Sequence, residues 1–220
     1  MSLPVKVCGI TRLEDAEAAI ACGAQALGFN FHRPSPRYIA PERVREIVAE
    51  LPPFVVTTGV FVQQSAEEMD RIVALCPLDR IQLHGGEPAE MVGAVSRPAY
   101  RAFRLKEEGD LAAVEAAPED TVLLDTFDLE LFGGTGRAFN WEWARRIGET
   151  HRVILAGGLT PDNVARALAA AQPAALDVVT GVEAAPGIKD AGKIARFFEA
   201  VQGHSFTTPS PWSAGHASAQ

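Results

Sequence analysis

The stretch VVTTGVFV at residues 55–62 is almost uninterrupted apolar sequence and is rich in β-branched side chains. TVLLD at residues 121–125 and RVILAG at residues 152–157 have the same character. Short runs of this kind are typical of strands buried on both faces, as in a parallel sheet with helices outside it. The chain is therefore predicted to have an α/β fold.

Further runs of this type alternate with amphipathic segments along the chain. Eight strand-then-helix units are the number in one (β/α)8 TIM barrel, and 220 residues suit a single such domain. We predict this parallel eight-stranded barrel for residues 1–203, although an open doubly wound sheet would show the same alternation. The predicted strands are 4–10, 25–31, 54–62, 79–83, 99–104, 121–126, 152–156 and 175–180, and the predicted helices include 13–22, 41–51, 65–75, 161–171 and 190–201.

Residues that commonly cap helices precede three of the predicted helices. Thr11 stands before an acidic first turn, Ser65 precedes Glu67 and Glu68, and Thr160 is followed by Pro161. Each is predicted to mark a helix start, because hydroxyl oxygens can accept from free backbone N–H groups and proline suits the first helical position.

The overall composition narrows the class of ligand. The net charge is −8 and the pI about 5.2, which argues against binding to nucleic acid or to an anionic membrane surface. An anionic small molecule remains compatible with the acidic composition, because backbone N–H groups and local cations can reverse the potential within a cleft.

Three scattered cysteines without a CxxC pair indicate neither a disulfide framework nor a zinc site. We expect a cytoplasmic enzyme, since there is no leader-like or membrane-spanning run, with a flexible tail at residues 204–220.

Unusual polar residues follow the predicted strands, where TIM barrels carry their active sites. Cys8 and Asp125 end the first and sixth strands, Arg37 follows the second, and His84 ends the fourth. Cys8 alone would be read as a small core residue, His84 as a core histidine and Arg37 as a solvated cation. Their shared position favours a functional interpretation, and Arg37 between prolines could clamp a carboxylate.

Glycine clusters follow the last three strands and indicate an anion site. Glycine lets backbone N–H groups approach a ligand closely, and loops after strands seven and eight commonly bind phosphate in this fold. Lys6 shares a strand face with Cys8 and could pair with an interior acid such as Glu183. The candidate phosphate-binding residues are Gly134, Thr135, Gly136, Gly157, Gly158, Thr180 and Gly181.

Seven segments in order resemble the motifs of the phosphoribosylanthranilate isomerase family, from about residue 4 to residue 201. They are VKVCGITRLEDA, ALGFNFHRPSPRYI, GVFVQ, IQLHGGE, LLDTFDLELFGGTGRAFNW, ILAGGLTPDNV and LDVVTGVEAAPGIKD. The resemblance implies a cofactor-free and metal-free Amadori isomerase of tryptophan biosynthesis, either monomeric or homodimeric. It also implies that Cys8 is the general base, Asp125 the general acid and Arg37 the ligand of the anthranilate carboxylate, with the glycine loops holding the phosphate.

Four positions depart from the usual family motifs. Thr180 replaces serine and keeps a hydroxyl, Asn140 replaces an aspartate and could cap a helix equally well, and Asn30 with His32 could alter packing near the aromatic ring. Two other functions stay open at this point: another phosphosugar barrel enzyme, such as an epimerase or an indole-forming synthase, and a non-catalytic phosphate-ligand sensor. The pair Cys8 and Asp125 argues against both.

Overall fold

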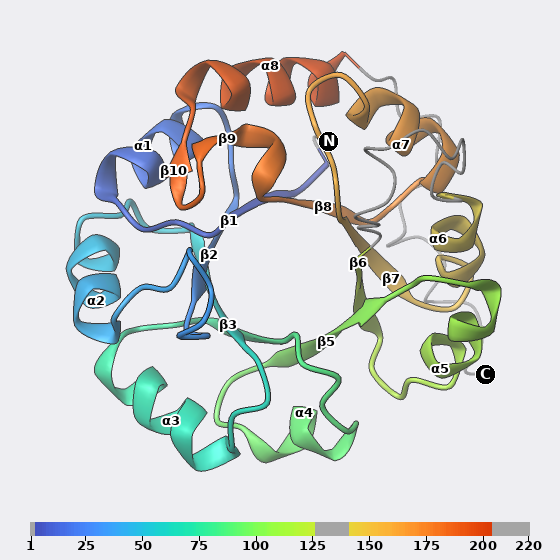
Figure 1. Cartoon of the computed structure of the whole chain (residues 1–220), viewed down its shortest axis with the longest axis horizontal. Coiled ribbons are helices and arrows are strands. Elements are labelled where there is room, and N and C mark those ends of the chain that lie inside the picture. The colour runs from blue at the N-terminus through green and yellow to red at the C-terminus, as the bar shows by residue number, and fades with distance from the viewer. Residues whose placement is uncertain (1–2, 126–140, 204–220) are drawn as a thin grey trace, which may run out of the picture.

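The computed structural model of the chain describes residues 3–125 and 141–203. Eight strands close into one barrel in chain order, with β1 beside β8 and all neighbours parallel (Figure 1). The predicted TIM barrel is confirmed, and the open doubly wound sheet is excluded. The strands are β1 (Val5–Cys8), β2 (Ala26–Asn30), β3 (Val56–Phe61), β4 (Arg80–Leu83), β5 (Ala99–Arg104), β6 (Thr121–Asp125), β7 (Arg152–Ala156) and β8 (Ala175–Val178).

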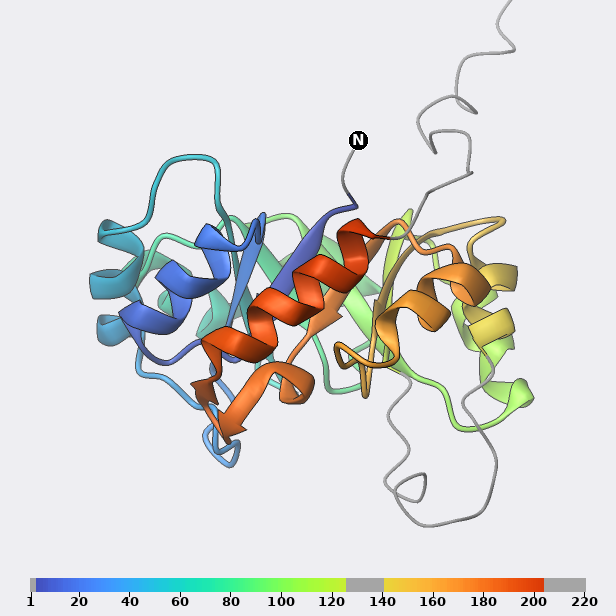
Figure 2. The ribbon, with the colours of Figure 1, turned by 90° about the horizontal axis from the view of Figure 1, so that it is seen from above.

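Helices surround the barrel and cover its outer face (Figures 1 and 2). A two-stranded antiparallel hairpin, β9 with β10, follows β8 and lies beside the loops at one end of the barrel (Figure 2). The sequence had not indicated this hairpin. The bounds are α1 (Leu13–Ala21), α2 (Pro41–Ala49), α3 (Ala66–Leu75), α4 (Glu90–Ala94), η1 (Glu108–Asp110), α5 (Leu111–Glu115), α6 (Trp141–Ile147), α7 (Val164–Ala171), η3 (Thr180–Val182), β9 (Glu183–Ala185), β10 (Ile188–Lys189) and α8 (Ala191–Gln202).

Alternate side chains of β1 point outward to the apolar core and inward to the barrel interior. Val5 and Val7 are buried in the large apolar cluster that joins strands to helices. Lys6 instead contacts Gln82 of β4 across the barrel and Asp177 of the neighbouring β8, so its side chain points inward. Because successive side chains of a strand point to opposite faces, Cys8 shares the inward face with Lys6.

Of the three predicted cap residues one was correct, although α1 does begin at Leu13 as predicted. Ser65 and Glu68 form the reciprocal capping box ahead of α3. The Thr11 hydroxyl instead donates to the carbonyl of Gly187, and Arg12 occupies the cap position of α1. The prediction at Thr160 was wrong because α7 begins later, at Val164, after a turn closed by the side chain of Asn163.

Several predictions concern residues outside the described ranges. They are the tail at 204–220, the glycine loop with Gly134, Thr135 and Gly136, and the cap at Asn140. Within residues 3–125 and 141–203, no helix has the length and apolar character needed to cross a membrane.

Candidate active site

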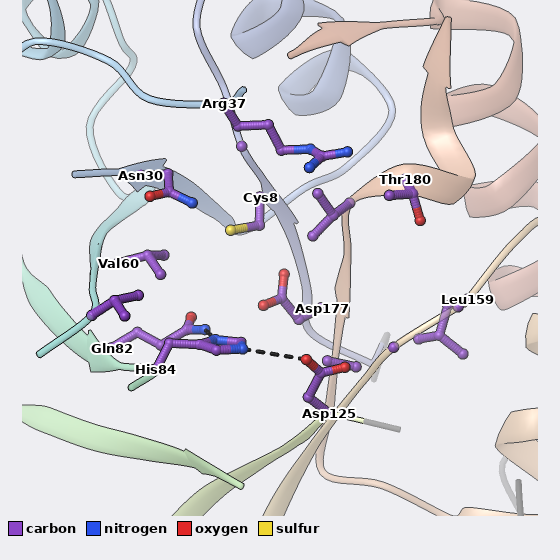
Figure 3. Close-up of a pocket in the computed structure, with 16 residues that line it drawn as sticks. Cys8, Asn30, Arg37, Val60, Gln82, His84, Asp125, Leu159, Asp177 and Thr180 are labelled. Carbon is purple, nitrogen blue, oxygen red and sulfur yellow. Dashed lines mark hydrogen bonds and ion pairs between the residues drawn. The ribbon is translucent and has the colours of Figure 1, made fainter. Parts of the chain in front are cut away.

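A cavity of about 290 Å³ opens where the strands end, and it gathers most of the predicted site residues (Figure 3). Gly181 is not in its wall but lies next to Thr180, which is. Asn30, Gln82 and Asp177 also line the cavity, and the sequence had not indicated Gln82 or Asp177 as site residues. The predicted residues in the wall are Cys8, Arg37, His84, Asp125, Gly157, Gly158 and Thr180.

Cys8 lies at the end of β1 and is only 6% exposed, yet its side chain lines the cavity. Gly28 on the neighbouring strand makes room for it: a Cβ at position 28 would lie 2.5 Å from the Cys8 sulfur. Burial raises the pKa of the Cys8 thiol, and the nearby Lys6 ammonium offsets part of that rise. The thiol form therefore dominates in the free protein, and Lys6 is the main group that stabilises the thiolate.

Lys6 forms a buried ion pair with Asp177, with 2.7 Å between Nζ and Oδ2. The predicted pairing of Lys6 with Glu183 was wrong, because β1 lies beside β8 with Lys6 directly opposite Asp177 in the register. The second carboxylate oxygen of Asp177, Oδ1, is buried without a hydrogen-bond partner among the described residues. Since Asp177 also lines the cavity, this oxygen is an unused acceptor beside the ligand space.

His84 joins two residues across the cavity wall. Its Nε2 lies 3.3 Å from Asp125 Oδ2, and its Nδ1 lies 2.8 Å from Gln82 Nε2 (Figure 3). Arg104 is also near Asp125, at 4.0 Å, but is largely exposed. A carboxylate at the end of β6 is thus held against an imidazole from β4.

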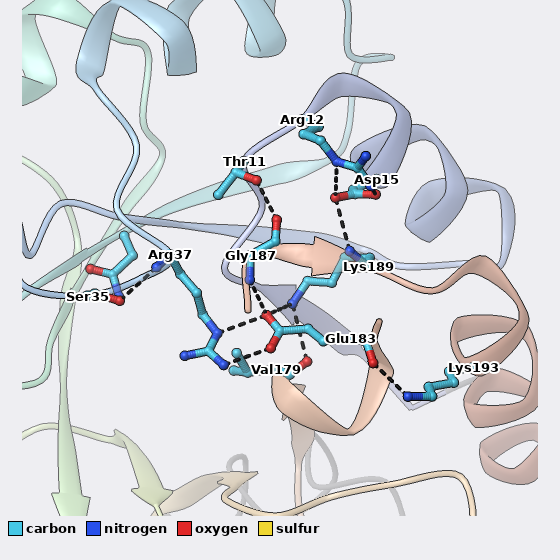
Figure 4. Close-up of polar contacts among 11 residues, drawn as sticks. Thr11, Arg12, Asp15, Ser35, Arg37, Val179, Glu183, Gly187, Lys189 and Lys193 are labelled. Atoms are coloured by element: carbon cyan, nitrogen blue, oxygen red, sulfur yellow. Dashed lines mark hydrogen bonds and ion pairs between the residues drawn. The ribbon is translucent and has the colours of Figure 1, made fainter. Parts of the chain in front are cut away.

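Arg37 reaches the cavity rim from the loop after β2 and is held by Glu183 (Figure 4). Its Nε and one terminal nitrogen bind the two Glu183 oxygens at 2.8 and 2.7 Å. The Ser35 hydroxyl accepts from the Arg37 backbone N–H, and Asn30 binds both Ser35 and the His32 N–H. Asn30, one of the departures from the family motif, therefore braces the loop that carries Arg37.

Glu183 is itself fixed by the β9–β10 hairpin (Figure 4). It accepts from Lys189 Nζ at 3.1 Å and from the Gly187 N–H at 3.2 Å, while Asp15 anchors the Lys189 backbone. Burial alone would raise the pKa of Glu183, but Arg37 and Lys189 lower it below its ordinary value. Two cations against one carboxylate leave this corner of the cavity with a net positive charge, which suits an anionic ligand.

The loops after β7 and β8 pack backbone against backbone. A Cβ at Gly181 would overlap the Leu159 carbonyl oxygen and lie only 2.8 Å from its carbonyl carbon, so only glycine fits there. Gly157 and Gly158 have φ of 85° and 60°, values that glycine adopts without strain. Gly157, Gly158 and Thr180 from these two loops therefore lie together in the cavity wall, with Gly181 next to Thr180.

The residues missed by the sequence could have been found in part. Asp177 is an acid in a strand that is otherwise apolar, LDVV, which is the same signal that singled out Asp125. Gln82 offers no comparable signal, because an amide in a strand is common. Among residues 3–125 and 141–203, no three His, Cys, Asp or Glu side chains are grouped as metal ligands would be.

Comparison with known proteins gives a consistent family. The sequence profile described as N-(5'phosphoribosyl)anthranilate (PRA) isomerase matches residues 5–200. An N-(5'-phosphoribosyl)anthranilate isomerase of Geobacter metallireducens is 48% identical over 193 residues, covering 88% of this chain and 96% of the relative. The crystal structure of phosphoribosyl anthranilate isomerase from Thermotoga maritima matches with a TM-score of 0.85 and 40% identity, over 91% of this chain and 99% of that one.

A second solved structure shows the kind of ligand that such a barrel holds. It is phosphoribosyl anthranilate isomerase in complex with reduced 1-(o-carboxyphenylamino)-1-deoxyribulose 5-phosphate. It matches with a TM-score of 0.83 and 38% identity, covering 91% of this chain and 99% of that chain. That ligand carries a carboxylate and a phosphate.

Proposed function

This chain belongs to the N-(5'-phosphoribosyl)anthranilate isomerase family, and we propose that it converts N-(5'-phosphoribosyl)anthranilate into 1-(2-carboxyphenylamino)-1-deoxyribulose 5-phosphate. The reaction is an Amadori rearrangement, an aldose–ketose isomerisation that needs proton transfers but no external oxidant or reductant. In the cell it is a step of tryptophan biosynthesis.

One observation carries the proposal: Cys8 and Asp125, from β1 and β6, line the same cavity. Two proton-transfer groups from distant parts of the sequence thereby face one ligand space (Figure 3). Isomerisation of a sugar needs an acid and a base placed around the substrate, and this pair can supply both.

In the proposed mechanism, Asp125 first donates a proton to the furanose ring oxygen. The ring C–O bond breaks, and the electron pair on the anthranilate nitrogen forms a Schiff base. Cys8, as thiolate, then removes the proton from the adjacent sugar carbon to give an enolamine, which tautomerises to the ketone. Burial favours the thiol form of Cys8 in the free protein. The proposed role of Lys6 is therefore to stabilise the fraction of Cys8 that is present as thiolate.

Binding is assigned to the two anionic ends of the substrate. Arg37 would hold the anthranilate carboxylate, since the net positive charge around Glu183 favours an anion there. The phosphate would occupy the glycine loops, with Gly157, Gly158 and Thr180 from the cavity wall and Gly181 next to Thr180. Gly134, Thr135 and Gly136 are proposed to complete this site from outside the described residues, and His84 would contact substrate beside Asp125.

Turnover of freshly prepared phosphoribosylanthranilate tests the function directly. The fluorescence of the anthranilate group should change at a rate proportional to enzyme concentration, faster than the spontaneous decay of the substrate. A protein that binds the substrate without accelerating the change would be a phosphate-ligand sensor, and the proposed activity would be rejected.

The cellular setting and the oligomeric state are tested separately from the activity. We propose a cytoplasmic enzyme with a small-molecule substrate, present as a monomer or homodimer, that binds neither nucleic acid nor membranes; the net charge of −8 supports the last point. Analytical ultracentrifugation gives the oligomeric state, and a species larger than a dimer would contradict this prediction.

A further inference from the structure

Four side chains form a continuous line of hydrogen bonds across the barrel interior. Lys6 Nζ lies 2.9 Å from Gln82 Oε1, and Gln82 Nε2 lies 2.8 Å from His84 Nδ1. His84 Nε2 in turn lies 3.3 Å from Asp125 Oδ2. Gln82 is only 1% exposed and Lys6 6%, so the contact between them is shielded from solvent. The line begins beside Cys8 and ends at Asp125.

The direction of every hydrogen bond in this line follows from its first member. A lysine ammonium has three donors and no acceptor, so Gln82 must turn its carbonyl oxygen toward Lys6. The Tyr100 hydroxyl is 3.1 Å from the same oxygen and supports this orientation. The amide nitrogen of Gln82 then faces His84 Nδ1 as a donor. Nδ1 must therefore be the unprotonated nitrogen, and the proton of neutral His84 must be on Nε2.

Lys6 stays charged in its buried position, which keeps this direction fixed. Burial would lower its pKa, but the Asp177 carboxylate at 2.7 Å raises it above the ordinary value. Lys6 is therefore protonated, and only a donor, around neutral pH. The orientation of the Gln82 amide is a consequence of this charge.

We propose that Gln82 is a positioning residue that holds His84 as the neutral Nε2–H tautomer, directed at Asp125. The functional meaning rests on the proposed role of Asp125 as the acid. An imidazolium at 3.3 Å would form a charge-assisted pair with Asp125 and keep it ionised. A neutral imidazole donates a weaker hydrogen bond, which leaves Asp125 able to hold the proton that it must give to the substrate.

Among the described residues, the other charged and titratable groups near this pair do not take the place of Gln82. Arg104, from β5, is 4.0 Å from Asp125 but largely exposed to solvent. Asp177, from β8, is paired with Lys6, and Tyr100 of β5 and Cys8 of β1 adjoin Lys6. No described residue other than Gln82 has a hydrogen bond to His84 Nδ1.

Nitrogen-15 NMR of the histidine side chains, without substrate, tests the tautomer. We expect His84 at pH 7 to show an unprotonated Nδ1 and a protonated Nε2, with its signals identified among the five histidines by their loss in His84→Asn. The opposite tautomer, or an imidazolium, in the wild-type protein would overturn the proposal without any substitution at position 82.

Gln82→Met then asks whether the amide is responsible. The variant keeps most of the side-chain volume and removes the donor to Nδ1, so the two nitrogens of His84 should lose their distinct tautomer signature. Tyr100→Phe is the matched control, because it removes the other donor to Gln82 Oε1 and leaves Lys6 to orient the amide. An unchanged tautomer in Gln82→Met, or an equal change in Tyr100→Phe, contradicts the proposal.

The pH profile of kcat gives a second readout that a purely structural role would not produce. In Gln82→Met the alkaline limb should move to lower pH, and kcat at neutral pH should fall about tenfold, the equivalent of one unit in the proton affinity of the acid. A uniform loss of kcat with an unmoved limb would show that Gln82 only supports packing. Because the tautomer is read without turnover, an inactive wild-type protein would reject the proposed function and leave this test intact.

Discussion

Two ion pairs border the cavity, and they differ in what holds them. The interior pair, Lys6 with Asp177, comes from adjacent strands, and its side chains are 6% and 3% exposed. The rim pair, Arg37 with Glu183, comes from a loop and a hairpin, and its arginine is 19% exposed. The barrel register places the first pair, whereas the second depends on local hydrogen bonds.

Because of this difference, we expect the interior and rim regions to have different functions. Groups on strands are held rigidly, which suits proton transfer, where small displacements reduce the rate strongly. The rim pair has donors on the cavity side and solvent nearby, which suits capture of a charged ligand. Substitutions in the interior should therefore act on kcat and on stability, and substitutions at the rim should act on KM.

The largest effect is expected for Cys8→Ala. Loss of the proposed base should lower kcat by about 10²–10⁴-fold while KM changes little. The matched control is Cys22→Ala, because Cys22 lies on the outside of the barrel after α1 and should leave both constants unchanged. Steady-state kinetics measure both constants, and near-normal turnover of the Cys8 variant would reject Cys8 as the base.

Lys6→Met should destabilise the fold more than any rim substitution. Asp177 would be left as a buried charge without a partner, at a cost of about 3–5 kcal/mol in the free energy of unfolding. Urea denaturation measures the change, with the exposed Lys106→Met as control. Adding Asp177→Leu should recover much of the loss; an unchanged free energy in the single variant would show that the pair is not buried as described.

Arg37→Ala should act on binding. Hydrogen bonds to a charged group contribute about 1.5–3 kcal/mol, which corresponds to a rise in KM of roughly 10- to 150-fold. Arg33→Ala is the control, since Arg33 belongs to the same loop and is exposed over the Tyr38 ring. Equal effects of the two variants would mean that the loop, and not the guanidinium of Arg37, determines affinity.

The smallest effect is expected for the free energy of unfolding at acid pH, through the carboxylate of Glu183. Because the pKa of Glu183 is lowered in the folded protein, its contribution is complete above the ordinary glutamate range and is lost as the pH falls through the lowered value. The loss should be about 1 kcal/mol or less, since Arg37 is 19% exposed and solvent screens its side of the pair. Thermal unfolding between pH 7 and pH 3 should show a shallower decline for Glu183→Gln; parallel curves would contradict this assignment.

Local patterns were enough to predict the strands and most helices, because burial on both faces gives strands a clear apolar signature. They also indicated several of the residues that line the cavity. What they could not predict was pairing between distant segments. Lys6 was correctly placed on the inner face, but its partner depends on the register of β1 against β8, which no local pattern contains. The same holds for Gln82, whose role depends on a contact with Lys6 across the barrel.

The β9–β10 hairpin was missed for a related reason. Its strands are three and two residues long, too short for any alternation to be visible. Thr11 was read as a helix cap because its sequence context fits, but its hydroxyl is used by Gly187 of this hairpin. A tertiary contact therefore replaced a local one.

The close approach of Gly181 to the Leu159 carbonyl has a consequence for engineering. Two loops that touch through their main chains cannot be exchanged one at a time, since a donor loop with any side chain at that point would push its neighbour aside. Transplanting this part of the barrel into another scaffold requires both segments as a single cassette, and libraries that randomise position 181 will return mostly misassembled ligand sites.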